Sequence, residues 1–232
     1  MKRLLIFFAF HITAWLSLSG RLLKAQQARP SDFLILTAWT PDIEKYALLS
    51  AENKSTYSRK HGYHFRAIRD GFDASRPPPW SKIRFIQEAL RQHRWVFWSD
   101  ADSLIMNPEI RLENLLQPGS DILLTEASTP YRHINTGQML FRSCIFSRLF
   151  LEAVWRQKAF IHDGTWEQRA VNHLMETCPL PRVHIVPNRI CNAFADVPED
   201  PDPYQPGDFI VHFPGCSDKY ELMKRYAALA QT

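Results

Sequence analysis

The sequence predicts an α/β protein that folds as a single domain around a largely parallel central sheet. Short apolar runs alternate along the chain with longer segments whose apolar residues recur at helical spacing. Strands that alternate with helices in this way form βαβ units, which place the strands parallel. The 232 residues, 45% of them hydrophobic, can bury a sizeable core, and no linker is long enough to divide them into two domains.

The first half of this domain is predicted to hold three strands and two helices. The run DFLILTAW, after Pro30, predicts the first strand, and the helical pattern that follows ends at Gly62, a residue that commonly closes helices. HFRAI predicts a second short strand, and the prolines at 77–79 keep the next loop extended. An amphipathic helix over 80–93 and a buried strand at 95–98 complete this half.

The second half repeats the same alternation of apolar runs and helical segments. The runs DILL, QMLF, VHIV and FIVHF have the length and composition of strands, whereas two longer segments have helical spacing. The predicted elements are strands at 121–124, 138–141, 183–186 and 209–213 and helices over 145–156 and 166–175.

Charge and glycine usage argue against several large classes of protein. The net charge is only +4 and no block of five basic residues occurs, so the chain lacks the signature of a nucleic-acid-binding protein. The eight glycines are dispersed and form no GxGxxG, GxxxxGK[ST] or GxSxG motif. Rossmann dehydrogenases, P-loop NTPases and α/β-hydrolases are therefore disfavoured.

The stretch WVFWSDAD ends a predicted strand with two carboxylates one residue apart. If the extended geometry continues, Asp100 and Asp102 point to one spot and Ala101 faces away, because side chains alternate along a strand. Like charges this close need a cation or a shared proton, and carboxylates suit Mg²⁺ or Mn²⁺. The alternative is a chance pair in a turn; a second pair, Asp200 and Asp202, lies in a Pro-rich stretch that predicts a solvated loop.

The N-terminus has the pattern of a targeting segment. Basic residues flank an apolar run at 4–20, so residues 1–24 predict either a single membrane anchor or a cleaved signal peptide. Residues 25–31 form a short stem and 32–232 the globular domain, which is expected on the non-cytoplasmic side or, after cleavage, secreted. In such a compartment the four cysteines could form disulfides, in any of three full pairings.

Five motifs in order give the chain a resemblance to a known family. It resembles the galactosyl/mannosyl/xylosyltransferase family of retaining GT-A glycosyltransferases, which includes fungal Golgi α-mannosyltransferases and plant xyloglucan xylosyltransferases. The resemblance covers most of residues 32 to 227. It rests on NKSTYSRKHGY (53–63), WSKIRFIQEALRQHRWVFWSDADSLIMNP (80–108), NTGQMLFRS (135–143), WEQRA (166–170) and HFPGC (212–216).

The resemblance implies a GT-A fold and a metal site for Mn²⁺ or Mg²⁺. Asp100 and Asp102 match the family's Asp-x-Asp motif, and His212 matches its third metal ligand. His212 follows an apolar run, which suits a strand end at the same edge of the sheet, and imidazole is a good ligand for Mn²⁺. From the residues alone, an ordinary core or capping histidine is the alternative.

The resemblance also implies a nucleotide-sugar donor site. Its members would be Thr37, Lys82, Asn135, Thr136 and Gly137. The amide and hydroxyl of the NTG motif suit sugar hydroxyls, and the lysine, in a Trp-x-Lys pattern, could approach the diphosphate. The alternatives are a plain turn for the NTG motif and a solvated helix position for the lysine.

Glu167 and Gln168 are the candidate catalytic residues that the resemblance implies, at the start of a predicted helix. The family commonly has aspartate where this chain has the longer Glu167. An acid that only favours the helix dipole is the alternative. No residue is singled out as a nucleophile, so a front-face reaction and a covalent intermediate both stay open.

The function that follows is a membrane-anchored, metal-dependent retaining glycosyltransferase, Golgi-like if the source is eukaryotic. It would move an α-linked galactose, mannose or xylose from a nucleotide-sugar donor to a glycan acceptor. Two alternatives stay open from the residues. One is a metal-dependent phosphohydrolase that takes further ligands from Glu126, Asp163 or Glu167. The other is a non-catalytic, membrane-anchored sugar-binding protein.

Overall fold

The computed structural model describes residues 28–127, 133–195 and 203–230. The strands are β1 (Phe33–Ala38), β2 (His64–Ile68), β3 (Trp95–Ser99), β4 (Ser103–Ile105), β5 (Ile122–Glu126), β6 (Ile134–Arg142), β7 (Val183–Val186), β8 (Ala193–Phe194) and β9 (Ile210–His212). The α-helices are α2 (Glu44–His61), α3 (Ser81–Ala89), α4 (Ile145–Trp155), α5 (Glu167–Thr177), α6 (Asn188–Cys191) and α7 (Lys219–Leu229). Short 3₁₀ helices are η1 (Pro30–Asp32), η2 (Pro41–Ile43), η3 (Pro78–Trp80), η4 (Leu112–Leu115) and η5 (Lys158–Phe160).

The central sheet has six strands in the order β2-β1-β3-β6-β5-β7. β1 runs parallel to β2 and β3, and β5 runs parallel to β7, so the largely parallel sheet is confirmed. β6 is the exception, because it is antiparallel to both of its neighbours, β3 and β5. Residues 127–133, between β5 and β6, are too few for the crossover of a dozen or more residues that a parallel pair requires.

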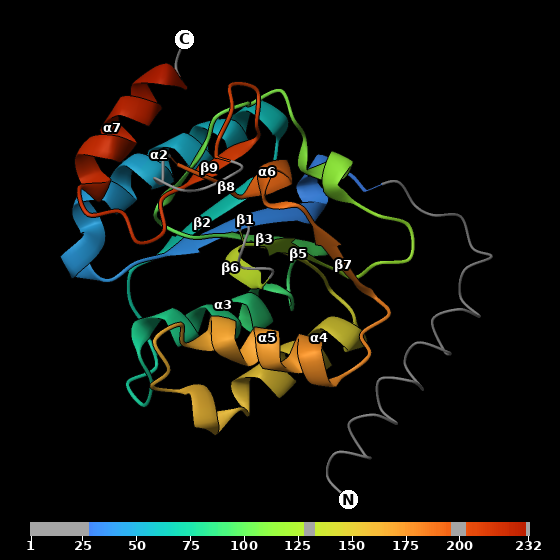
Figure 1. Cartoon of the computed structure of the whole chain (residues 1–232). Helices are drawn as coiled ribbons and strands as arrows, with labels where there is room; N and C mark the ends of the chain where they lie inside the picture. The colour runs from blue at the N-terminus through green and yellow to red at the C-terminus, as the bar shows by residue number, and fades with distance from the viewer. Residues whose placement is uncertain (1–27, 128–132, 196–202, 231–232) are drawn as a thin grey trace, which may run out of the picture.

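Helices and a small second sheet cover the two faces of the central sheet (Figure 1). Helices α3, α4 and α5 lie on one face; α2, α6 and α7 lie on the other with β8 and β9. The strand β1 is apolar throughout because both of its faces are buried. Leu34 and Leu36 belong to the cluster between the sheet and helices α3, α4 and α5, whereas Phe33 and Ile35 belong to the cluster on the opposite face. A strand buried on both faces reads as a continuous apolar run.

The second sheet has three strands in the order β4-β9-β8. The strand predicted at 209–213 exists as β9, but it does not lie in the central sheet, so the prediction that His212 sits at the same sheet edge as Asp100 was wrong. Instead β9 pairs antiparallel with β4, and Ser103 lies opposite His212. The strands β4 and β8, of three and two residues, are too short for an apolar pattern to reveal them.

Most predicted elements are confirmed. Gly62 closes α2 with a φ of 74°, in the left-handed region. None of the four cysteines forms a disulfide. The predicted anchor or signal peptide at 1–24 and residues 25–27 of the predicted stem at 25–31 lie outside the described residues. Within the described ranges, no helix combines the length and the hydropathy that crossing a bilayer requires.

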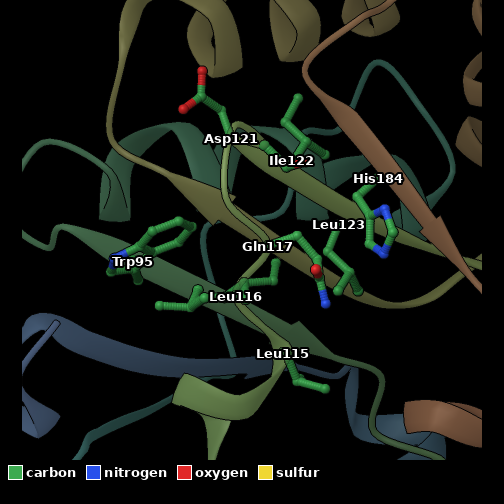
Figure 2. A pocket seen from close by; sticks show the side chains of 10 residues that line it. Trp95, Leu115, Leu116, Gln117, Asp121, Ile122, Leu123 and His184 are labelled. Atoms are coloured by element: carbon green, nitrogen blue, oxygen red, sulfur yellow. The ribbon is translucent and has the colours of Figure 1, made fainter. Parts of the chain in front are cut away.

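A small cavity lies at the opposite end of β3 from Asp100. Trp95, the first residue of β3, lines it together with Leu116 and with His184 of β7 (Figure 2). Its volume of about 10 Å³ is room for about one water molecule. It is therefore too small to be a substrate site.

Candidate active site

The two aspartates of the strand-end motif converge, but by a different geometry from the predicted one. The strand β3 ends at Ser99 and the chain turns through Ala101 and Asp102 before β4 begins, so the condition that the extended geometry continues is not met. Ala101 is the buried residue of this turn and packs in a cluster with Trp39. The turn nevertheless brings ligand atoms of Asp100, Asp102 and His212 within 4.8 Å of one another.

His212 reaches this position from the end of β9. Its Nε2 lies 3.1 Å from Asp102 Oδ1, and the backbone N–H of Phe213 donates to the carbonyl of Asp102 at 2.9 Å. The imidazole is buried, and its Nδ1 has no hydrogen-bond partner. What sets His212 apart from an ordinary core histidine is its contact with Asp102 beside Asp100.

Gly137 of β6 leaves the space that the imidazole fills. A Cβ on Gly137 would lie 2.3 Å from His212 Cε1, 2.7 Å from His212 Nδ1 and 2.8 Å from Asn135 Oδ1. The backbone N–H of Asp100 also donates to the carbonyl of Gly137 at 2.8 Å. Gly137 therefore holds the aspartate end of β3 and makes room for His212 at the same time.

Two carboxylates and one imidazole form a donor set that suits a divalent cation such as Mn²⁺ or Mg²⁺. The close approach of the two aspartates to each other and of His212 Nε2 to Asp102 is an observation that a bound cation accounts for. Asp100, Asp102 and His212 thus fit the metal site that the sequence predicts. This is the one cluster of three such side chains found in the part of the chain that the structure describes.

Lys82 lies between two carboxylates. Its Nζ is 2.9 Å from Asp100 Oδ1 and 2.9 Å from Glu167 Oε1, and the side chain is 6% exposed, so the solvated-lysine alternative is wrong. Burial opposes protonation, but the ion pairs with Asp100 and Glu167 hold the pKa of Lys82 above its usual range. Trp98 Nε1 donates a second hydrogen bond to Asp100 Oδ1, at 2.6 Å.

Glu167 is buried at the first turn of α5. Thr136 Oγ1 donates to its Oε1 at 3.0 Å, while Oε2 is buried without a partner. Burial raises the pKa of Glu167, and the ammonium of Lys82 opposes that rise. Glu167 is thus a buried carboxylate paired with an ammonium, which makes it more than a surface acid at a helix N-terminus.

Gln168 and the NTG motif lie beside Glu167. The backbone N–H of Thr136 donates to Gln168 Oε1 at 3.2 Å, and Asn135 Oδ1 accepts from the N–H of Gly137 at 2.9 Å. The motif lies in β6 rather than in a plain turn. Because Asn135 pairs with Thr125 and Met139 with Leu124, residues 136–138 bulge away from β5, as strands often do near active sites.

Thr37 is the predicted site residue that no described hydrogen bond joins to the others. It lies in β1, fully buried, and its Oγ1 has no hydrogen-bond partner. Its position near the carboxyl end of β1 is nevertheless the end of the sheet at which ligands bind in open α/β folds.

Several site residues are absent from the sequence predictions. Lys219, at the start of α7, places its Nζ 2.6 Å from Asp102 Oδ2. Although burial opposes ionisation of Asp102, His212 and Lys219 hold the pKa of that carboxyl below its usual range. Gln138 is fully buried, and neither atom of its amide has a partner. The position of Lys219, a basic residue shortly after the HFPGC motif, could have indicated its role. No sequence pattern distinguishes Gln138 from other residues of a buried strand.

Trp166 precedes Glu167 in an unusual backbone conformation. It has a φ of 49° and ψ of −124°, and it is the non-glycine residue with positive φ in the described chain. Its side chain is 40% exposed. A bulky residue is costly in this region, and such strain tends to persist at functional sites. This conformation turns the chain abruptly at the start of α5, whose first residue is Glu167.

The sequence profile of the galactosyl transferase GMA12/MNN10 family matches residues 31–126 and 117–222. The chain belongs to this family. The predicted resemblance is therefore confirmed, and the membership covers the two aspartates, the NTG motif, Glu167 and His212.

Other members of the GMA12/MNN10 family are similar over most of this chain. An alpha-1,2-galactosyltransferase of Schizosaccharomyces pombe is 24% identical over 82% of this chain and 61% of its own length. The probable alpha-1,6-mannosyltransferase MNN10 of Saccharomyces cerevisiae is 25% identical over 79% of this chain and 59% of its own length. The chain thus spans about three fifths of the length of these curated relatives.

A solved structure shows the same fold. The glycosyltransferase involved in glycosylation of the major capsid of PBCV-1 superposes with a TM-score of 0.69 at 20% identity, covering 84% of this chain and 98% of that one. The predicted GT-A fold is confirmed.

The space beside Gly137 gives a first prediction. Gly137→Ala should displace the imidazole of His212, because the new Cβ would lie 2.3 Å from its Cε1. We expect the free energy of unfolding to fall by about 1–3 kcal/mol and the affinity for Mn²⁺ to fall by about tenfold or more. Urea unfolding and titration with Mn²⁺ measure the two effects.

Gly164→Ala is the matched control, because nothing lies within 4 Å of a Cβ at Gly164. It should leave both quantities nearly unchanged. If Gly137→Ala bound Mn²⁺ as tightly as the wild type, the imidazole would not belong to the metal site.

Proposed function

We propose that the protein is a metal-dependent retaining glycosyltransferase that moves an α-linked galactose, mannose or xylose from a nucleotide-sugar donor to a glycan acceptor. One observation carries the proposal: the cluster of Asp100, Asp102 and His212 adjoins the Lys82–Glu167 ion pair, in a member of the GMA12/MNN10 family. The names of the relatives support the sugars. The proposed cation is Mn²⁺, with Mg²⁺ as the alternative, since the set includes an imidazole.

The charges of the site support a diphosphate ligand. Asp100, Asp102 and Glu167 contribute three carboxylates, against which stand the ammonium groups of Lys82 and Lys219. The site is thus close to electrically balanced by its own residues. When bound, a divalent cation supplies two further positive charges and polarises the diphosphate leaving group. The site then carries a net positive charge, which favours an anionic ligand such as a nucleoside diphosphate.

The two lysines and the residues of β6 have distinct roles in this proposal. Lys219 exchanges its carboxylate partner for a diphosphate oxygen, to which an ammonium is a strong donor. Lys82 keeps its ion pairs with Asp100 and Glu167 and contributes its positive charge beside the diphosphate. Asn135, Thr136 and Gly137 line the donor side, where the bulge of β6 turns polar groups away from the β5 ladder. Thr37, at the carboxyl end of β1, is the proposed contact to the remainder of the donor.

Glu167 and Gln168 are the proposed catalytic residues. Thr136 and Lys82 fix Oε1 of Glu167, which leaves Oε2 as the oxygen that can face a ligand. A carboxylate there stabilises the positive charge that develops on the anomeric carbon. If Oε2 attacks the anomeric carbon, retention proceeds through a covalent intermediate. If Oε2 only stabilises the positive charge, retention proceeds by a front-face reaction.

The alternative functions have less support. A phosphohydrolase with two cations needs further acidic ligands, but the described residues contain no second cluster of three metal-binding side chains. Asp163 accepts hydrogen bonds from Thr165, and Glu126 is exposed at the end of β5. A non-catalytic sugar-binding protein has less support because the chain belongs to a family of transferases.

The metal ligands give the central prediction of this proposal. Asp100→Asn and Asp102→Asn should each lower Mn²⁺-dependent turnover of the donor by at least about 100-fold, because each removes a charge at nearly constant shape. Release of nucleoside diphosphate from nucleotide-linked galactose, mannose and xylose measures it and identifies the donor. Glu176→Gln, a half-exposed carboxylate on α5, is the control and should be silent. Full activity in both asparagine variants would place the site elsewhere.

Lys219 gives a prediction that separates the diphosphate from the cation. Lys219→Met should weaken nucleoside diphosphate binding in the presence of Mn²⁺ by roughly 10- to 100-fold, as expected for a charged hydrogen bond. Mn²⁺ alone should bind no more weakly than to the wild type, because Lys219 competes for Asp102 Oδ2. Calorimetric titrations measure both affinities. The control is Lys224→Met on the exposed side of α7; equal loss of both affinities would make Lys219 a structural support of the metal site.

The location of the protein is the remaining part of the proposal. We propose that residues 4–20 anchor it in a Golgi-like membrane with the catalytic domain on the non-cytoplasmic side, or that it is secreted after cleavage. The apolar run with flanking basic residues and the fungal relatives support this. In sealed microsomes the domain should resist protease until detergent is added. Digestion without detergent would overturn this orientation, and N-terminal sequencing separates anchor from secretion.

A further inference from the structure

Lys54 is a buried lysine of α2 that has no role in the proposed function. Its side chain is 0% exposed. Its Nζ donates to Ser50 Oγ, to the carbonyl of Asp100 at 2.8 Å and to the carbonyl of Ser103 at 3.1 Å. An ammonium has three N–H groups, and here three acceptors use all of them. Lys54 therefore has no donor left for a substrate.

The neighbours of Lys54 bind the same turn. Ser50 Oγ donates to the carbonyl of Ser103 at 2.8 Å. Asn53 exchanges two hydrogen bonds with the backbone of Ile105, at 2.9 and 2.7 Å. Ser103 Oγ in turn donates to the carbonyl of Asp100 at 2.8 Å. One face of α2 thus holds the backbone from the end of β3 to the end of β4 through side-chain contacts.

A buried ammonium is a costly way to hold a turn. Burial lowers the pKa of Lys54 to about 7, although the carboxylates of Asp102 and Asp100 act against that shift. An apolar side chain of similar volume would fill the same space without the desolvation cost. The hydrogen bonds to the carbonyls of Asp100 and Ser103 are what such a replacement could not supply.

We infer that Lys54 is a positioning residue of the metal site: its ammonium fixes the backbone of residues 100–103, so that the carboxylates of Asp100 and Asp102 stand together beside His212. The inference rests on the proposed metal site. By this inference Lys54, the lysine of the NKSTY motif, shapes the Asp-x-Asp turn, although it lies 46 residues before Asp100. Lys54 acts through that backbone and does not touch the cation or the donor.

The positive charge of Lys54 and its positioning role predict opposite effects of its removal on the affinity for Mn²⁺. If its positive charge were its main influence, its loss would strengthen cation binding, because like charges repel. If it positions the turn, its loss weakens cation binding, as loss of the groups that orient metal ligands does, by about 10- to 100-fold. The sign of the change in Mn²⁺ affinity therefore separates the two roles.

The experiment measures Mn²⁺ binding in the absence of any donor. Lys54→Met keeps the length of the side chain and removes the ammonium. Free Mn²⁺ is followed by electron paramagnetic resonance during titration of the full chain, and folding is checked by circular dichroism and urea unfolding. Lys60→Met, on the exposed side of the same helix, is the matched control. We expect a folded Lys54→Met protein whose dissociation constant for Mn²⁺ is at least about tenfold higher, and an unchanged constant for Lys60→Met.

An unchanged or tighter Mn²⁺ affinity in folded Lys54→Met would overturn the inference while leaving the metal site intact. If Lys54→Met fails to fold, Ser50→Ala replaces it, since this variant removes one acceptor of Lys54 and one donor to Ser103. A folded Ser50→Ala protein with wild-type Mn²⁺ affinity would then overturn it. Absence of Mn²⁺ binding in the wild type would instead remove the proposed metal-dependent function itself.

Discussion

The ammonium of Lys82, held between Asp100 and Glu167, joins the parts of the molecule that make up the site. Lys82 comes from α3, Asp100 from the end of β3 and Glu167 from the start of α5, and Thr136 of β6 adds a hydrogen bond to the same carboxylate. A buried charge whose partner is lost costs about 3–5 kcal/mol. The orientation of α3 and α5 on the sheet is therefore constrained by this group as well as by apolar packing, and the geometry of the site is fixed before any ligand arrives.

The direction of β6 explains why polar residues from two strands meet. Because β6 is antiparallel to β3, the beginning of β6 lies beside the end of β3, where Ser99 pairs with Gln138. The NTG motif opens one strand and the aspartates follow the other, and both are found at one edge of the sheet. In a fully parallel sheet the start of β6 would lie at the opposite edge. The single reversed strand thus supplies the site with a second set of backbone and side-chain groups.

The sequence predicted the larger elements well because their signals are local. Apolar runs such as FLIL and WVFW and the helical spacing of α3 to α5 depend on neighbours within a few residues. The residues after the buried strand indicated Asp100 and Asp102, and the resemblance added His212; the structure brings the three together. The short strands β4 and β8, the turn at Ala101 and the membership of β9 in a second sheet depend on contacts between distant segments. The same holds for Lys54 and Lys219, whose partners lie 46 and 117 residues away; the motifs near them in sequence do not show which groups these lysines contact.

His212 and Asp102, in contact at the site, are 110 residues apart along the chain. A cation held by both is a cross-link that closes most of the domain into a loop. A cation that binds the folded protein but not the unfolded chain stabilises the fold by an amount that grows with the logarithm of its free concentration once this exceeds the dissociation constant. Metal supply in the compartment where the chain matures then becomes a determinant of how long the folded protein persists. A chain that ends before β9 lacks His212, so it loses both a proposed metal ligand and the cross-link that the cation would form.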